Sequence, residues 1–191
     1  MVENFIGEYK ISDDAVDEIL SYWQFNKSIA RQGTISKLGN DPHPDDTYKK
    51  SLELFIEPHE INNFLYAKEL FHCLEQYKKD FEHSDRVESY AITEQTKIQY
   101  YDKGWGFYEW HFENDGTDHS IVRHLVFATY LNDVEDGGTE FLYQGYRTTA
   151  KKGSTIIFPA IWTHTHKSQV TNNQEKYLIT GWFNFIKKIS I

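Results

Sequence analysis

One change of hydrophobic pattern limits the possible folds of this 191-residue chain more than any other feature. In the first part of the chain the apolar residues recur at helical spacing. From about Thr96 they form short apolar or alternating runs separated by Gly, Asn and Asp. Since the helical patterns lie almost entirely before the strand patterns, we expect helices packed against a jelly-roll sheet rather than units that alternate around a parallel sheet.

Two helices are expected in the first part. One follows Ser12, where apolar residues recur at helical spacing as far as Trp23, and the other covers about residues 60–79. The apolar stripe of the second helix comprises Ile61, Phe64, Ala67, Phe71, Leu74 and Tyr77. Between the helices, residues 25–50 are polar and contain several Gly and Pro, so they form either a lid or substrate loop or a mobile surface loop.

Six strands are expected in the second part, at residues 97–101, 107–113, 124–131, 140–143, 154–161 and 177–186. A chain of this length fits one domain. We therefore predict a single domain over residues 1–191, with a largely helical part at 1–85 and the sheet core at 86–191. A domain boundary near Ser84 is the less favoured alternative.

Charge and composition exclude some classes of partner. The net charge of −9 disfavours nucleic acid, because backbone binding depends on Lys and Arg that replace counterions. No window approaches the ~20 consecutive apolar residues that cross a bilayer, so no membrane partner is expected. A lone Cys73 and the lack of a signal-like start favour a cytoplasmic protein. The sequence leaves a monomer and a homodimer equally open.

A possible metal site begins at His111 and Glu113. These two residues lie on one predicted strand, whose alternate side chains point to the same face. A second histidine would complete a set of two imidazoles and one carboxylate, which suits non-haem Fe(II) and leaves positions open for a cosubstrate and dioxygen. The pair alone is weak evidence, because nine histidines and 29 acidic residues produce such a spacing easily by chance.

The segments 158–168 and 175–183 give the pattern its specificity, since an apolar strand runs into histidines and a turn then leads into another apolar strand. Here the chain resembles the 2-oxoglutarate- and Fe(II)-dependent oxygenase superfamily, in its prolyl 4-hydroxylase-like branch, over about residues 97–185. In that family a Lys or Arg follows the distal metal histidine by ten residues and binds the far carboxylate of 2-oxoglutarate. The resemblance therefore implies His166 as the third ligand and Lys176 as the anion-binding residue, with His164 as the alternative ligand.

Other positions match the family less closely. Tyr101 resembles a tyrosine that also contacts 2-oxoglutarate, although Tyr100 is an alternative, and Trp182 matches a tryptophan near the cosubstrate or is a core aromatic. The pair Gly137 and Gly138 resembles a family turn, in which glycine permits positive φ and has a structural role. Two departures are that Glu113 replaces the commoner aspartate and that Val126 stands where a threonine is often found.

The resemblance implies a double-stranded β-helix, the jelly-roll or cupin-like core, with the N-terminal helices packed against one sheet. It also implies a dioxygenase that uses Fe(II), 2-oxoglutarate and O2, with ascorbate as a stimulant, and that hydroxylates an unactivated C–H bond with release of succinate and CO2. The expected substrate is a prolyl residue in a peptide or protein. Alternatives are a free amino acid or small metabolite, and, in another class, a cupin-like metal-binding module or zinc hydrolase.

Overall fold

The computed structural model describes residues 4–36 and 42–186. An eight-stranded antiparallel sheet forms the centre of the molecule, in the order β1-β9-β6-β11-β5-β3-β2, with β4 paired to β11 off this path. Its strands are β1 (Gly7–Lys10), β2 (Arg31–Gln32), β3 (Leu52–Ile56), β4 (Tyr90–Ala91), β5 (Thr96–Tyr101), β6 (Arg123–Tyr130), β9 (Ser154–Pro159) and β11 (Lys176–Phe185).

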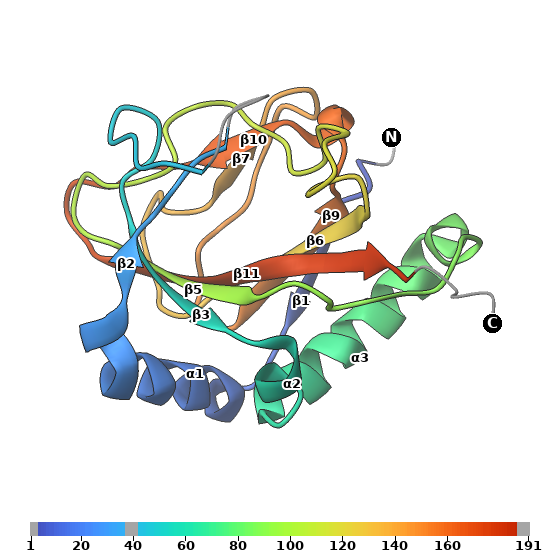
Figure 1. Ribbon diagram of the computed structural model, residues 1–191, viewed down its shortest axis with the longest axis horizontal. Coiled ribbons are helices and arrows are strands. Elements are labelled where there is room, and N and C mark those ends of the chain that lie inside the picture. Colours follow the sequence, from blue (N-terminus) through green and yellow to red (C-terminus); the bar gives the residue numbers. More distant parts are fainter. Residues whose placement is uncertain (1–3, 37–41, 187–191) are drawn as a thin grey trace.

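A smaller antiparallel sheet lies on the other side of the molecule from the helices, as the positions of β7 and β10 in Figure 1 show. It has the order β10-β7-β8 and consists of β10 (His166–Ser168), β7 (Thr139–Phe141) and β8 (Tyr146–Arg147). Together the two sheets form the expected jelly-roll core, and the prediction of a mainly β fold with flanking helices is confirmed.

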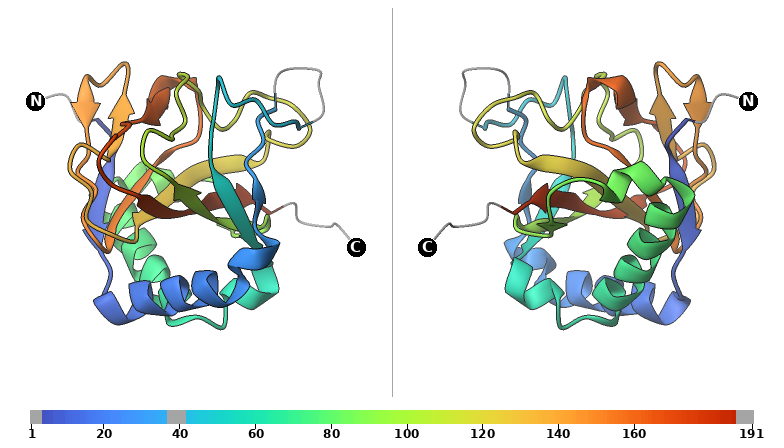
Figure 2. Two further views of the ribbon diagram at one scale, coloured as in Figure 1. Left: turned by 90° about the vertical axis from the view of Figure 1, so that its left-hand side faces the viewer. Right: turned by 90° about the vertical axis from the view of Figure 1, so that its right-hand side faces the viewer.

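The helices cover one face of the large sheet (Figures 1 and 2). They are α1 (Asp13–Asn26), α2 (Pro58–Ile61) and α3 (Leu65–Asp80). The chain also contains the short 3-10 helices η1 (Lys27–Ile29), η2 (Glu82–Asp85) and η3 (Trp162–His164), and η3 lies directly before β10 of the small sheet. The Ser12 side chain accepts a hydrogen bond from Ala15 N at 3.2 Å, which satisfies a free backbone donor and fixes the start of α1. No helix within the described residues is long and apolar enough to cross a membrane.

The prediction of one continuous helix over residues 60–79 is wrong, because the chain breaks between α2 and α3. The Asn63 side chain donates to His59 O at 3.1 Å, and its backbone N–H donates to Glu60 O as in a turn. Side chains that bond to the nearby backbone compete with helix formation. The predicted stripe is also partly wrong, since Phe71 is exposed while Tyr66 and Leu70 are fully buried.

The large sheet separates two hydrophobic clusters, and alternate residues of one strand belong to different clusters. On β6, Leu125 and Phe127 pack toward the helices, whereas Val126 and Ala128 belong to the cluster between the two sheets. This alternation follows from the two-residue period of a strand. The helix side is therefore an ordinary apolar core, and the other side faces the cavity described below.

Five of the six predicted strands are present, namely β5, β6, β7, β9 and β11, but no strand covers residues 107–113. That segment hydrogen-bonds in turn to three different partners: Tyr108 N to Tyr48 O, His111 N to His166 O and Glu113 N to Ala160 O. Because its partner changes every few residues, no continuous ladder forms. The structure also contains short strands that the sequence did not indicate, including β1, which pairs with β9, and β3, which pairs with β5.

The glycine pair has a structural role, although it does not adopt the positive φ that glycine permits. Neither Gly137 nor Gly138 has positive φ, and Asp136 does, at 51°. The physical reason for glycine is close approach: a Cβ on Gly138 would lie 2.0 Å from the Thr148 carbonyl oxygen, and one on Gly137 would meet Val134. The segment therefore requires small residues at these two positions for space rather than for conformation.

Candidate metal centre

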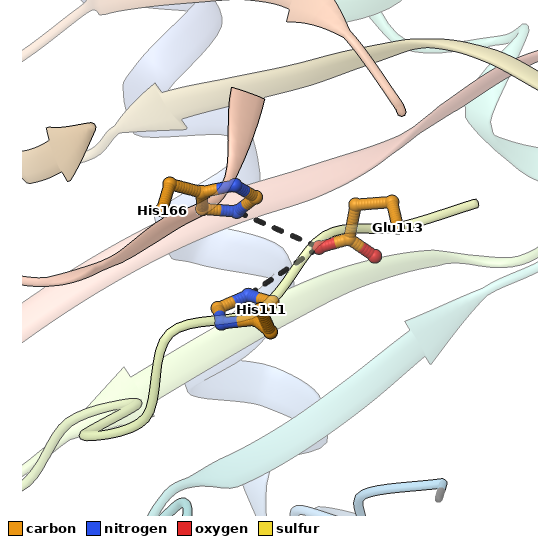
Figure 3. A group of neighbouring side chains, drawn as sticks. All are labelled: His111, Glu113 and His166. Atoms are coloured by element: carbon orange, nitrogen blue, oxygen red, sulfur yellow. Dashed lines mark ion pairs between the residues drawn. The ribbon is translucent and has the colours of Figure 1, made fainter. Parts of the chain in front are cut away.

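Three side chains from two distant segments converge at one point, as Figure 3 shows. His111 and Glu113 lie on the extended segment after β5, and His166 is the first residue of β10. Glu113 Oε1 lies 3.5 Å from His111 Nε2 and 3.6 Å from His166 Nε2. A pair of backbone hydrogen bonds between His111 and His166, of 2.8 and 3.0 Å, holds the two segments side by side.

Both imidazoles are oriented by backbone carbonyls. Nδ1 of His111 lies 3.0 Å from Glu109 O, and Nδ1 of His166 lies 2.9 Å from His164 O. Since a carbonyl only accepts, each Nδ1 carries the hydrogen and each Nε2 presents its lone pair to the point of convergence. The His111 ring also stacks on Phe107 with centroids 3.5 Å apart.

The two oxygens of Glu113 have different partners. Oε1 faces the histidines, whereas Oε2 accepts a hydrogen bond from Trp182 Nε1 at 3.1 Å and lies 3.7 Å from Arg123 Nη1. Arg123 also lies over the Trp182 ring, 3.6 Å from its centroid. Thus Trp182, predicted to lie near the cosubstrate, orients the carboxylate of this site, and one Glu113 oxygen remains directed at both imidazoles.

The electrostatics keep Glu113 and His166 in the forms that bind a metal. Burial alone would raise the pKa of Glu113, but its interactions with His111, His166 and Arg123 outweigh it and lower that pKa. Burial, with His111 as a second cause, lowers the pKa of His166 to about 3. At neutral pH the site therefore presents a carboxylate and a neutral imidazole, as metal coordination requires.

The residues present fit an iron ion. The three donor atoms lie within 4.8 Å of one another, and the set of two histidines and one carboxylate is the facial triad of non-haem Fe(II) oxygenases. They open onto a cavity of about 340 Å³, within the usual range for small-molecule sites. Thr34, Ile35, Ser36, Pro42, Tyr48 and Lys49 also line this cavity, so the described parts of the 25–50 segment border the site; its residues 37–41 lie outside the described residues.

His164, the alternative ligand, lies elsewhere. Its side chain is buried, its Nε2 lies 3.0 Å from Asn4 O, and its Nδ1 lies 3.0 Å from the Thr163 hydroxyl. It does not belong to the group of converging donors. The local reason is η3, which ends at His164 and turns the chain so that only His166 faces Glu113.

Lys176 and Tyr101 lie next to each other on the paired strands β11 and β5. Lys176 is buried, and its Nζ donates to Gly137 O and Gln169 O, both at 3.0 Å, and to Ser168 Oγ. Its Nζ lies 5.1 Å from the Tyr101 ring, and the Tyr101 hydroxyl donates to Gln99 Oε1 at 3.0 Å. Tyr101 and Ser168 line the cavity, so Lys176 lies behind this wall.

Tyr100, the alternative to Tyr101, belongs to the opposite face of the sheet. Its ring stacks against Trp23 of α1, with centroids 6.0 Å apart. The strand period thus places Tyr101 and not Tyr100 at the cavity.

Sequence reasoning missed a second polar group in the same cavity. It comprises Lys49, Lys97 and Gln99, all of which line the cavity, together with Glu53 behind them. No signal could have revealed it, because polar residues that alternate with apolar ones in a strand ordinarily face solvent.

The 2OG-Fe(II) oxygenase superfamily model matches residues 96–184. No curated protein matches the chain. Among solved structures, a viral collagen prolyl hydroxylase from Paramecium Bursaria Chlorella virus-1, in its 2OG complex, superposes with a TM-score of 0.70 at 17% identity, over 95% of this chain and 97% of that one. A Pseudomonas putida prolyl-4-hydroxylase superposes with a TM-score of 0.67 at 14% identity, over 95% of this chain and 93% of that one. A Trichoplax adhaerens prolyl hydroxylase, in complex with a hypoxia inducible factor peptide fragment, superposes with a TM-score of 0.70 at 16% identity, over 95% of this chain and 84% of that one.

At these identities the solved structures show a common fold. The segment that the family model matches runs from β5 to β11 and contains His111, Glu113 and His166. Fe(II), 2-oxoglutarate and O2 are what this family requires. With the expected fold and a donor set that fits the family's metal, residues 96–184 match the 2OG-Fe(II) oxygenase superfamily, the chain has the fold of the prolyl hydroxylases compared above, and the protein is a 2-oxoglutarate-dependent dioxygenase.

Proposed function

We propose that this dioxygenase hydroxylates a prolyl residue in a peptide or protein, with His111, Glu113 and His166 as the ligands of Fe(II). The convergence of these three donors on one cavity carries the proposal. The similar solved structures support the choice of substrate, since they are described as prolyl hydroxylases and one of them holds a peptide fragment.

Bound Fe(II) would supply the activation of O2 that is coupled to oxidative decarboxylation of 2-oxoglutarate. The chain's own residues provide three donors, which leave half of an octahedral site for the cosubstrates. Trp182 and the Glu109 and His164 carbonyls fix the orientation of the donors, so little reorganisation is needed on binding. Apolar side chains, among them Val126 and Phe158, line the cavity and exclude water from the reacting groups.

Lys176 is the proposed partner of the far carboxylate of 2-oxoglutarate. Its ammonium donates to Ser168 Oγ, and Ser168 lines the cavity. An entering carboxylate would replace this neutral acceptor with a charged one, which makes a stronger hydrogen bond. Tyr101 borders the same region and is proposed to contact the cosubstrate as well.

The proposal includes a single domain over residues 1–191, a cytoplasmic location, no nucleic-acid or membrane partner, and a monomer or homodimer. The negative charge supports the exclusion of nucleic acid. Pairing of β1 and β3, from the first part of the chain, with β9 and β5 of the second supports one continuous fold.

The test supplies purified protein with Fe(II), ascorbate, 2-oxoglutarate and proline-containing peptides. We expect succinate to form and the peptide to gain one oxygen atom at proline, as measured by mass spectrometry. His111→Ala removes a ligand and should abolish both, whereas His72→Ala, an exposed change on α3, should leave both unchanged. Failure to bind 2-oxoglutarate anaerobically would contradict the proposal, and activity that needs no oxygen would favour a zinc hydrolase.

A further inference from the structure

The cavity side of β3 and β5 is polar where a sheet between two layers would normally be apolar. The two strands pair with Glu53 opposite Gln99 and Phe55 opposite Lys97. Their other faces, which include Leu54 and Ile98, pack in the helix-side core. Burying polar groups is costly unless they have partners, so the partners of this group show what it is arranged to bind.

Glu53 is the centre of the group. Its Oε1 accepts hydrogen bonds from Lys49 Nζ and from Gln99 Nε2, the latter at 2.8 Å, while Oε2 has no hydrogen-bond partner among the described residues. The side chains of Lys49 and Glu53 are 4% and 1% exposed, so this is a buried ion pair. Burial would raise the pKa of Glu53, but Lys49 and Lys97 outweigh it and lower that pKa. Glu53 is therefore a carboxylate that is hydrogen-bonded to Lys49 and lies close to a second lysine, Lys97.

Lys97 is the second lysine neighbour of Glu53; burial lowers its pKa, and the carboxylates of Glu53 and Glu113 oppose this effect. Its Nζ lies between two aromatic rings, 5.7 Å from the Phe55 centroid and 5.2 Å from the Trp182 centroid. Within residues 4–36 and 42–186, no hydrogen bond or ion pair joins its ammonium to an oxygen. Aromatic rings stabilise a cation only modestly, so the ammonium retains its capacity for a strong acceptor.

The other cation at this wall is already occupied. Arg123 donates to both Glu94 oxygens, at 2.7 and 3.2 Å, and to Glu113 O at 3.0 Å. Glu113 in turn is directed at the two histidines. Since Lys49 is paired with Glu53 and Arg123 with Glu94, Lys97 is the cation of this wall that, among the described residues, has no hydrogen-bonded oxygen partner.

Lys97 also lies close to the proposed reaction centre. The Trp182 ring that it contacts donates through Nε1 to Glu113. On β11, Thr180 pairs with Lys97. Lys176, the proposed partner of 2-oxoglutarate, lies four residues earlier on the same strand and therefore at a different place along the sheet. A group bound at Lys97 would thus be next to the metal centre and separate from the cosubstrate's far carboxylate.

We propose that Lys97, supported by the Lys49–Glu53–Gln99 group, binds a carboxylate of the substrate and so selects substrates with a carboxylate close to the reacting carbon. This deepens and rests on the proposed prolyl hydroxylase function. The carboxylate comes from a free amino acid, from the carboxyl end of a peptide, or from an acidic side chain next to proline, and the test separates these three sources.

The test compares three pairs of probes that differ only in a carboxylate or an amide. They are L-proline and L-prolinamide, N-acetyl-L-proline and N-acetyl-L-prolinamide, and an end-blocked peptide with Glu or Gln after proline. Binding to the anaerobic Fe(II) protein is measured by calorimetry with saturating 2-oxoglutarate, so that the probes do not occupy the Lys176 site.

We expect the carboxylate of at least one pair to bind at least about tenfold more tightly than its amide, because a charge-assisted contact in a poorly solvated site is lost in the amide. The pair that shows the preference identifies the source. Lys97→Met keeps the length of the side chain but removes the charge, and should abolish the preference. Lys97→Arg should retain it, as should Lys103→Met, which changes an exposed lysine.

Equal binding within all three pairs, or an undiminished preference in Lys97→Met, would overturn the inference. The proposed prolyl hydroxylase function fails by a different result, the absence of hydroxylated proline with every probe. Because the carboxylate preference is measured by binding and not by turnover, either proposal can fail while the other stands.

Discussion

The pH dependence of 2-oxoglutarate binding tests the role of Lys176 directly. Burial lowers the pKa of Lys176 to about 7, so near neutral pH about half of these side chains are uncharged. A carboxylate partner needs the ammonium form. Above pH 7, binding must therefore be accompanied by uptake of a proton, and below pH 7 the proton is already present.

The expected magnitude follows from this linkage. Each pH unit above the pKa of the free protein costs about 1.4 kcal/mol, or a factor of ten in affinity, until the pKa of the complex is reached. Between pH 7 and 9 the dissociation constant for 2-oxoglutarate should rise by up to about a hundredfold. In Lys176→Arg the guanidinium stays charged, because its pKa is above about 12, and the dependence should disappear.

The assay is an anaerobic titration of the Fe(II) protein with 2-oxoglutarate, followed by the visible charge-transfer band of the complex. Lys176→Met should bind weakly at every pH, by about thirtyfold or more at pH 7, since removal of one partner of a buried charge pair costs about 2 to 5 kcal/mol. Lys103→Arg, a surface change, serves as the control. Lys176 does not have this role if the dissociation constant of the wild type for 2-oxoglutarate does not change with pH. The same holds if it changes equally with pH in the wild type and in both Lys176 variants.

Four other outcomes are expected from the structure. Trp182→Phe removes the hydrogen bond to Glu113 and should weaken Mn(II) binding by about 10- to 100-fold in a metal titration; unchanged affinity would show that Trp182 does not position the carboxylate. Phe127→Ala leaves a cavity in the helix-side core and should lower the free energy of unfolding by about 3 to 5 kcal/mol in urea. Gly138→Ala brings a methyl group against the Thr148 carbonyl and should cost about 1 to 3 kcal/mol in the same measurement, and no cost would contradict the close approach. Mn(II) at about a hundred times its dissociation constant should stabilise wild type by about 2.7 kcal/mol in thermal unfolding and should have little effect on His166→Ala.

The sequence was informative where local patterns decide the structure. Ser12 and the apolar residues after it predict α1, and the apolar runs predict β6, β9 and β11 within one or two residues. The spacing of ten residues between His166 and Lys176 distinguished His166 from its neighbour His164, and the structure brings His166 and not His164 to Glu113.

The sequence was uninformative where partners are distant. Strands such as β1 and β10 are short, and each is defined by pairing with a segment far along the chain. For the same reason the segment around His111 was mistaken for a strand. Lys97 and Glu53 show a further limit, since alternating polar residues look the same in the sequence whether they face solvent or a cavity.

Strand register connects the stability of this protein with its chemistry. On β11, Ile179 and Phe183 pack against the helices, whereas Thr180 and Trp182 line the cavity. A shift by one residue would exchange the two faces, placing Trp182 among the helices and removing the hydrogen bond that orients Glu113. The apolar residues on the helix side fix this register because the opposite arrangement would expose them. The core under the sheet therefore positions the metal-site tryptophan, although it touches no substrate. It also follows that the polar side of the sheet can carry charged residues such as Lys97 without loss of the fold.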